Sequence, residues 1–199
     1  MFIELAEFLR CPADHPETHC VLAPLAIAGR DVVSGIVGCP ACRSEYRIEH
    51  GVAQFGEPPG RHPAPGPLPQ PEVVQALLGI ATPGGYVVLI GSAAALASDL
   101  ARLMSGVHLV AVNAPVSLER GPAVSLLTGH AAVPLRKAMA RGVVLGKEFA
   151  TSPWTEEAAR VLLPGLQLVV LSDRVAIDGT ETLATENGMW VGRKARSEK

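Results

Sequence analysis

Residues 84–91 read Gly-Gly-Tyr-Val-Val-Leu-Ile-Gly, a run of five apolar or aromatic residues between glycines. A short apolar run bounded by turn residues is typical of a strand buried on both faces of a sheet. Residues 72–80 before it and 93–104 after it have helical spacing, and residues 107–112 form a second apolar run. This order of helix, strand, helix and strand predicts an α/β fold with a parallel sheet.

The same alternation continues toward the C-terminus. We expect further strands at residues 124–127, 142–145 and 166–171, and intervening helical segments at residues 134–140 and 156–163. The short spacing between them favours a parallel sheet that is covered on both faces. Residues 182–185 and 189–192 flank Glu186-Asn187-Gly188, a turn that is typical of a closing β-hairpin.

Prolines divide the chain into two parts of different composition. Seven of the 17 prolines fall within residues 58–71, and such a run forms neither helix nor sheet because proline fixes φ and lacks an N–H group. We interpret it as a linker, although a ligand for an SH3-type domain is an alternative. The predicted units are a small β module at residues 1–57, the Pro-rich linker at residues 58–71 and an α/β domain at residues 72–199.

All four cysteines lie in the first unit, and two of them form the motif Cys39-Pro40-Ala41-Cys42. A C-x-x-C turn directs two thiolates to one point, and Zn²⁺ takes four such ligands in a tetrahedron. The second pair of ligands would include Cys11, with the fourth drawn from Cys20, His15 or Asp14; we favour Cys20 because thiolate binds Zn²⁺ best. A thioredoxin-like redox pair, or a ribbon that has lost its metal, is the alternative.

The first unit resembles the small zinc-ribbon family whose best known members activate tRNA and protein methyltransferases. The resemblance covers about 50 residues and is carried by three segments: Leu9-Arg10-Cys11-Pro12, Cys39-Pro40-Ala41-Cys42 and Tyr46-Arg47-Ile48-Glu49-His50-Gly51-Val52. Asp14 stands where the family pattern has another cysteine. The resemblance therefore implies a zinc ribbon whose fourth ligand departs from that pattern.

The second unit resembles a class I methyltransferase domain, which depends on S-adenosylmethionine (SAM). The matching positions follow in order: the strand and loop at residues 84–91, Asn113 after the second strand, Gly129-His130-Ala131, and Val161-Leu162-Leu163-Pro164-Gly165. The resemblance implies a Rossmann-like domain whose cofactor would contact Gly91, Ser92, Asn113 and His130.

Three of these positions depart from what the cofactor needs. Ser92 and the alanines after it put Cβ atoms where a glycine-rich loop leaves space, and Asn113 and His130 replace the acids that meet the ribose and the adenine. We expect weak or absent SAM binding. A nicotinamide dinucleotide enzyme is disfavoured because no G-x-G-x-x-G follows the first strand.

No arrangement of catalytic groups stands out in the sequence. Ser92, His130, Lys147 and Glu148 are polar residues near strand ends, and we interpret each as a cap, a surface group or a satisfied core residue. We therefore assign no catalytic residue and expect a methyltransferase-like pseudoenzyme that serves as a binding, scaffold or regulatory subunit. The alternative is an active, divergent SAM-dependent methyltransferase acting on a small molecule or a protein.

Composition narrows the partners. The formal charge is −2, so the chain has no basic field for nucleic acid, and its 48% apolar content excludes a disordered protein. Only 18% of the residues are charged, which suits a chain that buries surface in an oligomer or against a protein partner.

Residues 1–10 lack the basic segment of a secretory signal, so we expect a cytoplasmic protein. Thr82-Pro83-Gly84-Gly85 splits the uncharged stretch 73–98 into pieces that are too short to span a membrane, so we expect no membrane span.

Overall fold

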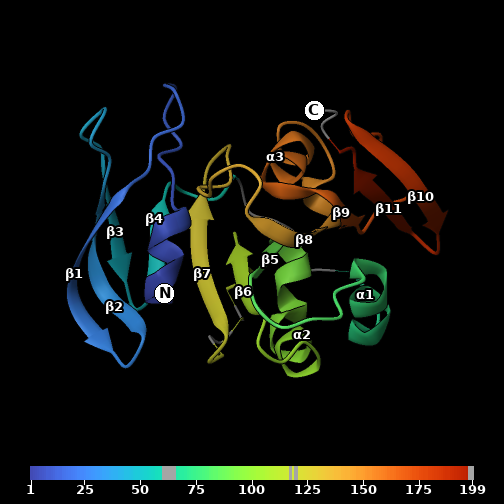
Figure 1. Cartoon of the computed structure of the whole chain (residues 1–199), viewed down its shortest axis with the longest axis horizontal. Helices are drawn as coiled ribbons and strands as arrows, with labels where there is room; N and C mark the ends of the chain where they lie inside the picture. The colour runs from blue at the N-terminus through green and yellow to red at the C-terminus, as the bar shows by residue number, and fades with distance from the viewer. Residues whose placement is uncertain (60–65, 117, 119–120, 197–199) are drawn as a thin grey trace.

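The computed structural model describes residues 1–59, 66–116, 118 and 121–196. Within these residues eleven strands form one sheet in the order β1-β2-β3-β4-β7-β6-β5-β8-β9-β11-β10 (Figure 1). The strands are β1 (Val21–Ala28), β2 (Asp31–Gly38), β3 (Glu45–Glu49), β4 (Val52–Phe55), β5 (Tyr86–Ile90), β6 (His108–Val112), β7 (Val124–Gly129), β8 (Ala140–Leu145), β9 (Leu162–Val170), β10 (Thr180–Glu186) and β11 (Met189–Lys194). The helices are α1 (Pro71–Leu78), α2 (Ala97–Leu103) and α3 (Trp154–Val161), with 3-10 helices η1 (Ile3–Phe8), η2 (Gly91–Leu96) and η3 (Lys147–Phe149). None of these described helices has both the length and the apolar character needed to cross a membrane.

The centre of the sheet is parallel from β4 through β7, β6, β5 and β8 to β9. Counted from β5, the first five strands of the second unit follow the spatial order 3-2-1-4-5, the order of doubly wound Rossmann-type sheets. Antiparallel pairs extend the sheet at both ends, β1 to β4 at one end and the hairpin β10–β11 at the other. The structure therefore confirms the predicted fold class, α/β, with a small N-terminal β module and a Rossmann-like parallel sheet.

The side chains of β5 alternate between two hydrophobic cores, as expected for a strand that is buried on both faces. Tyr86, Val88 and Ile90 belong to the core beneath η1 and α3. Val87 and Leu89 belong to the core beneath α1, η2 and α2. The strand β5 thus lies in the middle layer of a three-layer arrangement, in which helices cover both faces of the sheet.

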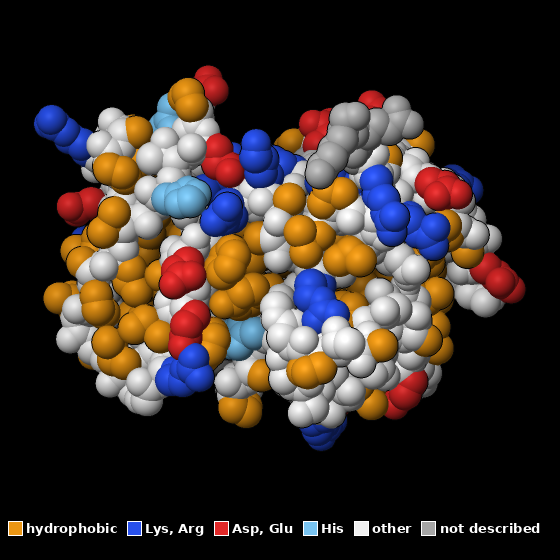
Figure 2. All heavy atoms as spheres, viewed as in Figure 1, with side chains coloured by type: hydrophobic (Ala, Val, Ile, Leu, Met, Phe, Trp, Pro, Cys, Tyr) orange, Lys and Arg blue, Asp and Glu red, His pale blue; other side chains and the backbone are white. Residues whose placement is uncertain are grey.

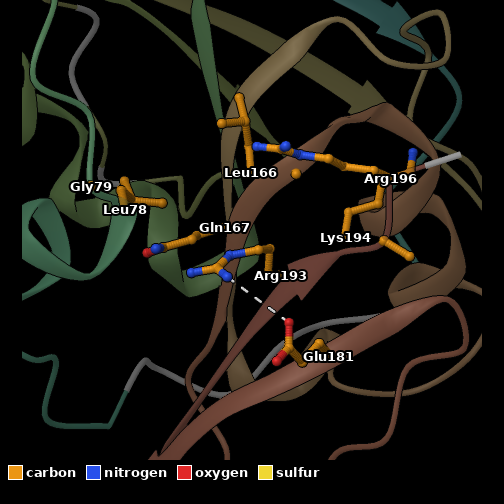
Figure 3. A pocket seen from close by; sticks show the side chains of 10 residues that line it. Leu78, Gly79, Leu166, Gln167, Glu181, Arg193, Lys194 and Arg196 are labelled. Carbon is orange, nitrogen blue, oxygen red and sulfur yellow. Dashed lines mark ion pairs between the residues drawn. The ribbon is translucent and has the colours of Figure 1, made fainter. Parts of the chain in front are cut away.

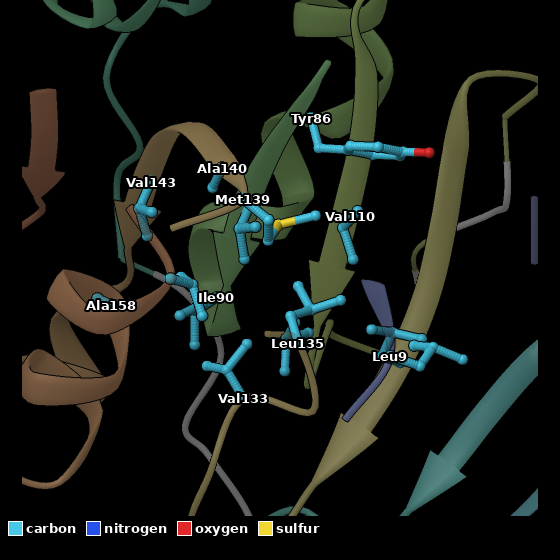
Figure 4. Packing of buried hydrophobic residues seen from close by; sticks show 14 of the residues in the cluster. Leu9, Tyr86, Ile90, Val110, Val133, Leu135, Met139, Ala140, Val143 and Ala158 are labelled. Carbon is cyan, nitrogen blue, oxygen red and sulfur yellow. The ribbon is translucent and has the colours of Figure 1, made fainter. Parts of the chain in front are cut away.

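The structure has no helix at residues 134–140, so our prediction of a helical segment there is wrong. Bends and one isolated bridge connect β7 to β8, and Ala138 has a φ of +49°, which is incompatible with a continuous helix. Leu9 from the N-terminal unit forms a bridge with Leu135, and the Arg10 N–H donates to the Pro134 carbonyl at 3.1 Å. The N-terminal segment thus covers a face of the sheet from which a crossover helix is missing (Figure 4).

Two other expectations need correction. The predicted helix at residues 93–104 consists of η2, which begins at Gly91, and α2, which begins at Ala97. The strand β1 was not predicted, because Pro24 interrupts its apolar run. Proline is tolerated at the edge of a sheet, where its missing N–H faces solvent, and β1 is the edge strand.

The boundaries of the predicted units remain a prediction, since residues 60–65 of the linker lie outside the described residues. The sheet, however, runs without interruption from one unit to the other. Parallel pairing joins β4 to β7, from Val52 opposite Leu126 to Phe55 opposite Gly129. Because Met1 and Leu5 share a core with Val88 of β5, the two units are packed as one body.

Candidate functional site

A cluster of metal-binding side chains lies in the N-terminal unit. Cys11 follows η1, and His15 lies in the turn after it. Cys39 directly follows β2, and Cys42 lies in the turn between β2 and β3. One donor atom from each of these four residues lies within 4.8 Å of the others. The short turn between β2 and β3 thus brings the C-x-x-C motif to the segment that carries Cys11.

The separations within this cluster match those of ligands around one zinc ion. The Sγ atoms of Cys11 and Cys42 are 3.6 Å apart, and Cys39 Sγ is 3.5 Å from His15 Nε2. Tetrahedral coordination with bond lengths of about 2.3 Å to sulfur and about 2.1 Å to nitrogen gives about 3.8 Å and about 3.6 Å for these separations. Three thiols and an imidazole therefore fit a tetrahedral metal.

Neighbouring polar groups surround the thiols. The Tyr46 hydroxyl is 3.1 Å from Cys11 Sγ, and the Ser44 hydroxyl is 3.2 Å from Cys42 Sγ. Hydrogen bonds from the Ser44 side chain and backbone lower the pKa of Cys42 to about 6. A thiol with a lowered pKa loses its proton readily and is a ready metal ligand.

The structure gathers His15 with the thiols, in place of the Cys20 that we favoured as the fourth ligand. Cys20 is buried in the hydrophobic core, and its backbone N–H donates to the Leu9 carbonyl at 3.1 Å. Burial, followed by the charges of the other cysteines, raises the pKa of Cys20 to about 12. Asp14, the third candidate, is exposed and lies outside the cluster.

The loop after β5 is the first of the positions expected to contact a cofactor. Gly91 has a φ of +67° and opens η2, so that the backbone N–H of Ser92 faces the residues after β8. That N–H donates to Oε1 of Glu148, and the Ser92 hydroxyl donates to Oε2 at 2.7 Å. One internal carboxylate therefore accepts both donors of Ser92.

Two glycines make room for the Glu148 carboxylate. A Cβ atom at Gly91 would overlap Glu148 Oε1 and the Phe149 ring. A Cβ atom at Gly146 would lie 2.5 Å from Ser92 Oγ and 2.8 Å from Glu148 Oε1. Sequence reasoning gave Glu148 no role, because only the parallel pairing of β5 and β8 brings it to Ser92.

Asn113 connects the ends of two strands. Its Nδ2 donates to the Gly129 carbonyl at 2.9 Å, and its Oδ1 accepts the Gly129 N–H, also at 2.9 Å. His130, which follows Gly129, is exposed, and its Nδ1 lies 3.4 Å from the Glu57 carbonyl oxygen. Both side chains thus face neighbouring backbone groups.

A pocket of about 780 Å³ opens beside the Glu148 carboxylate. Its walls come from the carboxyl ends of β5, β8 and β9, the turn between β10 and β11, and the segment before α1. The lining residues are Gly66, Pro67, Leu68, Pro69, Ser92, Lys147, Glu148, Leu171, Asn187, Gly188 and Met189. Of the four positions expected to hold a cofactor, this pocket includes Ser92.

A second pocket, of about 570 Å³, lies between the end of α1 and the strands β9 to β11 (Figure 3). Two of its basic side chains have internal partners. Arg193 forms an ion pair with Glu181 at 3.9 Å, and the Lys194 ammonium donates to the Arg160 and Leu162 carbonyls. No residue that the sequence predicts for a metal or a cofactor is among those described as lining it.

No family model matches the chain, and no curated protein matches it. Among solved structures the chain is similar to the antibiotic-resistance methyltransferase Kmr, at 13% identity over 65% of this chain and 95% of that one, with a TM-score of 0.45. It is similar to a SAM dependent methyltransferase from Aquifex aeolicus, at 16% identity over 61% of this chain and 87% of that one, with a TM-score of 0.46. It is also similar to a chain of the complex between the Haloferax volcanii Trm112 methyltransferase activator and a methyltransferase, at 13% identity over 63% and 90%, with a TM-score of 0.47.

Proposed function

We propose that this chain is a methyltransferase-like pseudoenzyme that acts as a binding, scaffold or regulatory subunit. The observation that carries the proposal is the contact between Glu148 and Ser92. The loop after the first strand of a Rossmann-type sheet binds its ligand through free backbone N–H groups. Here the Ser92 N–H and hydroxyl are bound to a negative side chain of the same protein, which also repels a second carboxylate such as the methionine end of SAM.

Asn113 supports the same conclusion at the other end of the expected site. A ribose is held by a carboxylate that accepts bonds from its hydroxyls. Asn113 is 5% exposed, and its Nδ2 and its Oδ1 each form a hydrogen bond with Gly129. The internal partners of Ser92 and Asn113 support the proposal that these positions no longer hold SAM.

We further propose that the metal cluster holds zinc in a structural role. Cys11, His15, Cys39 and Cys42 supply four protein ligands, and a zinc site with four protein ligands has no open position for substrate. The bound metal would cross-link the segment after η1 to the turn between β2 and β3. Such a site stabilises the fold and takes no part in catalysis.

A surface suited to association lies at the edge of the sheet. Val21, Leu25 and Ile27 of β1 are 63%, 77% and 49% exposed, and β1 carries no charged residue. Apolar side chains gather over this end of the molecule (Figure 2). An exposed apolar edge strand is a surface on which another chain can pair, and this supports a role in protein–protein interaction.

Calorimetric titration of the purified chain with SAM and with S-adenosylhomocysteine tests the loss of the cofactor site. We expect no heat of binding at micromolar ligand concentrations. Low-micromolar binding of either compound would contradict the proposal and favour the alternative, an active and divergent SAM-dependent methyltransferase. Titration with ATP, which shares the adenosine group, controls for non-specific heat.

A further inference from the structure

The Glu148 carboxylate lies at the point where the order of the sheet reverses. The strand β5 pairs with β6 on one side and with β8 on the other. From β5 the chain adds β6 and β7 on the first side, and it then adds β8 and β9 on the second side. In open α/β sheets, ligands bind in the crevice outside the carboxyl ends of the strands at such a position. In this chain Gly91 follows β5 and Gly146 follows β8, so the two glycines flank that crevice.

The crevice has the features of a built site for one carboxylate. The Ser92 N–H donates to one oxygen of Glu148 and the Ser92 hydroxyl donates to the other. Gly91 has a positive φ, and a side chain there would overlap Glu148 Oε1 and the Phe149 ring, so this position requires glycine. A Cβ atom at Gly146 would crowd the same carboxylate. Ser92 itself is 8% exposed, and its donors are therefore shielded from water.

We propose that residues 91–92 and 146 form a carboxylate-binding cradle which Glu148 fills from within the chain, and which binds a small free carboxylate once the Glu148 side chain is removed. This inference rests on the proposed function, because the same side chain excludes a cofactor with an anionic end. The adjoining pocket, which Ser92 and Glu148 both line, gives a free anion a route to the cradle. Two neutral donors suit a monoanion such as acetate or formate.

The Glu148→Ala variant tests the cradle with sodium acetate as the probe. We expect the melting temperature of the variant to fall by roughly 3–8 °C, because a charge-assisted pair of hydrogen bonds is lost. Acetate at up to about 100 mM should recover part of this loss in a saturable manner, with ionic strength held constant by sodium chloride. The wild-type chain should show no such response. Equal acetate responses of both proteins would overturn the proposal.

Glu156→Ala is the matched control, since Glu156 is exposed and accepts a bond from Ser152 outside the cradle. Its melting temperature should not respond to acetate. Glu148→Gln keeps the volume of the side chain and provides a second test if the alanine variant does not fold. The Ser92 amide proton resonance should move upfield in Glu148→Gln, because an amide oxygen is a weaker acceptor than a carboxylate. An unchanged Ser92 resonance would overturn the proposal.

The two proposals fail separately. Low-micromolar binding of SAM to the wild-type chain would contradict the pseudoenzyme function, whatever the response of the variants to acetate. An acetate-insensitive Glu148→Ala variant would contradict the cradle, even if the wild-type chain binds no SAM.

Discussion

Asn113 shows how one side chain can connect the ends of two neighbouring strands. Its φ is +53°, in the left-handed region that asparagine tolerates better than most residues. That conformation ends β6 and turns the amide toward Gly129 at the end of β7, where donor and acceptor both find backbone partners. The residue therefore links the carboxyl ends of β6 and β7, and it is buried there.

The Asn113→Asp variant restores an acid at this position, and we expect it to lose stability without gaining SAM affinity. Aspartate cannot donate to the Gly129 carbonyl, and its negative charge would face that oxygen across a gap of 2.9 Å in the native geometry. The expected cost is about 1–3 kcal/mol in the free energy of unfolding by urea. Asn187→Asp is the control, because Asn187 is exposed and has a similar φ of +52°. Micromolar SAM binding by Asn113→Asp would show that the site is intact.

At the scale of elements, α3 is tied to the N-terminal segment by a cluster of ion pairs. Arg10 donates to both carboxylate oxygens of Glu157 at 3.0 and 3.1 Å, and Arg160 donates to both at 2.7 and 2.8 Å. The Val133 N–H adds a third donor at 2.7 Å, and Arg160 also contacts Glu17 at 3.4 Å. A single carboxylate thus holds together the segment after η1, the β7–β8 connection and α3.

The Glu157→Gln variant should lose about 2–4 kcal/mol of stability at neutral pH, because two arginines lose a largely buried partner. Burial alone would raise the pKa of Glu157, but bonds and charge from Arg160 and the charge of Arg10 hold it below its ordinary value of 4.5. The contribution is therefore complete above pH 4.5 and is lost as the pH falls through the lower pKa of the folded state. Urea unfolding at pH 7 and below pH 4 should show the gap between wild type and variant closing.

Glu156→Gln serves as the control for Glu157→Gln, since it changes the neighbouring residue of α3, whose recorded partner is the exposed Ser152. We expect this change to leave stability within about 0.5 kcal/mol of wild type. Equal effects of the two substitutions would mean that helix propensity, and not the ion-pair cluster, accounts for the loss.

The helices and strands also show which parts of the fold could be predicted from the sequence. The strands β5, β6 and β8 were predicted because each contains a run of at least three consecutive apolar residues, a signal carried by the strand itself. The absence of a helix at residues 134–140 could not be predicted, because Leu135 pairs with Leu9, which is distant in sequence. The same holds for the site: the C-x-x-C motif is local and was found, whereas the contact between Ser92 and Glu148 requires the pairing of β5 with β8.

At the scale of the whole molecule, the N-terminal unit is part of the core of the α/β sheet. Phe2 stacks on His108 of β6 with ring centroids 4.4 Å apart, and Phe2 N–H donates to Ser125 Oγ of β7 at 2.9 Å. Burial lowers the pKa of His108 to about 4, which keeps this imidazole uncharged at neutral pH. Removal of the unit would expose one face of the sheet and the edge of β7.

Metal removal should consequently affect the whole molecule and not the N-terminal unit alone. Cys11 lies two residues after Leu9, which pairs with Leu135, so loosening the metal cluster also loosens the cover of the sheet. We expect one calorimetric unfolding transition with metal and one, at a lower temperature, after chelation, because a ligand of the native state stabilises all that unfolds with it. Two separate transitions, of which chelation shifts only the first, would contradict this coupling.

The ligand set can be tested in the same experiment by the metal content of purified variants. Cys39→Ser and His15→Ala should lose bound zinc and unfold at the temperature of the chelated protein. Cys20→Ser should retain one zinc per chain, because Cys20 lies in the core outside the cluster. Its stability should fall only by the cost of a buried hydroxyl. If Cys20→Ser lost the metal and His15→Ala kept it, the fourth ligand would be the cysteine that sequence reasoning favoured, and the Cys11, His15, Cys39 and Cys42 cluster would not be the metal centre.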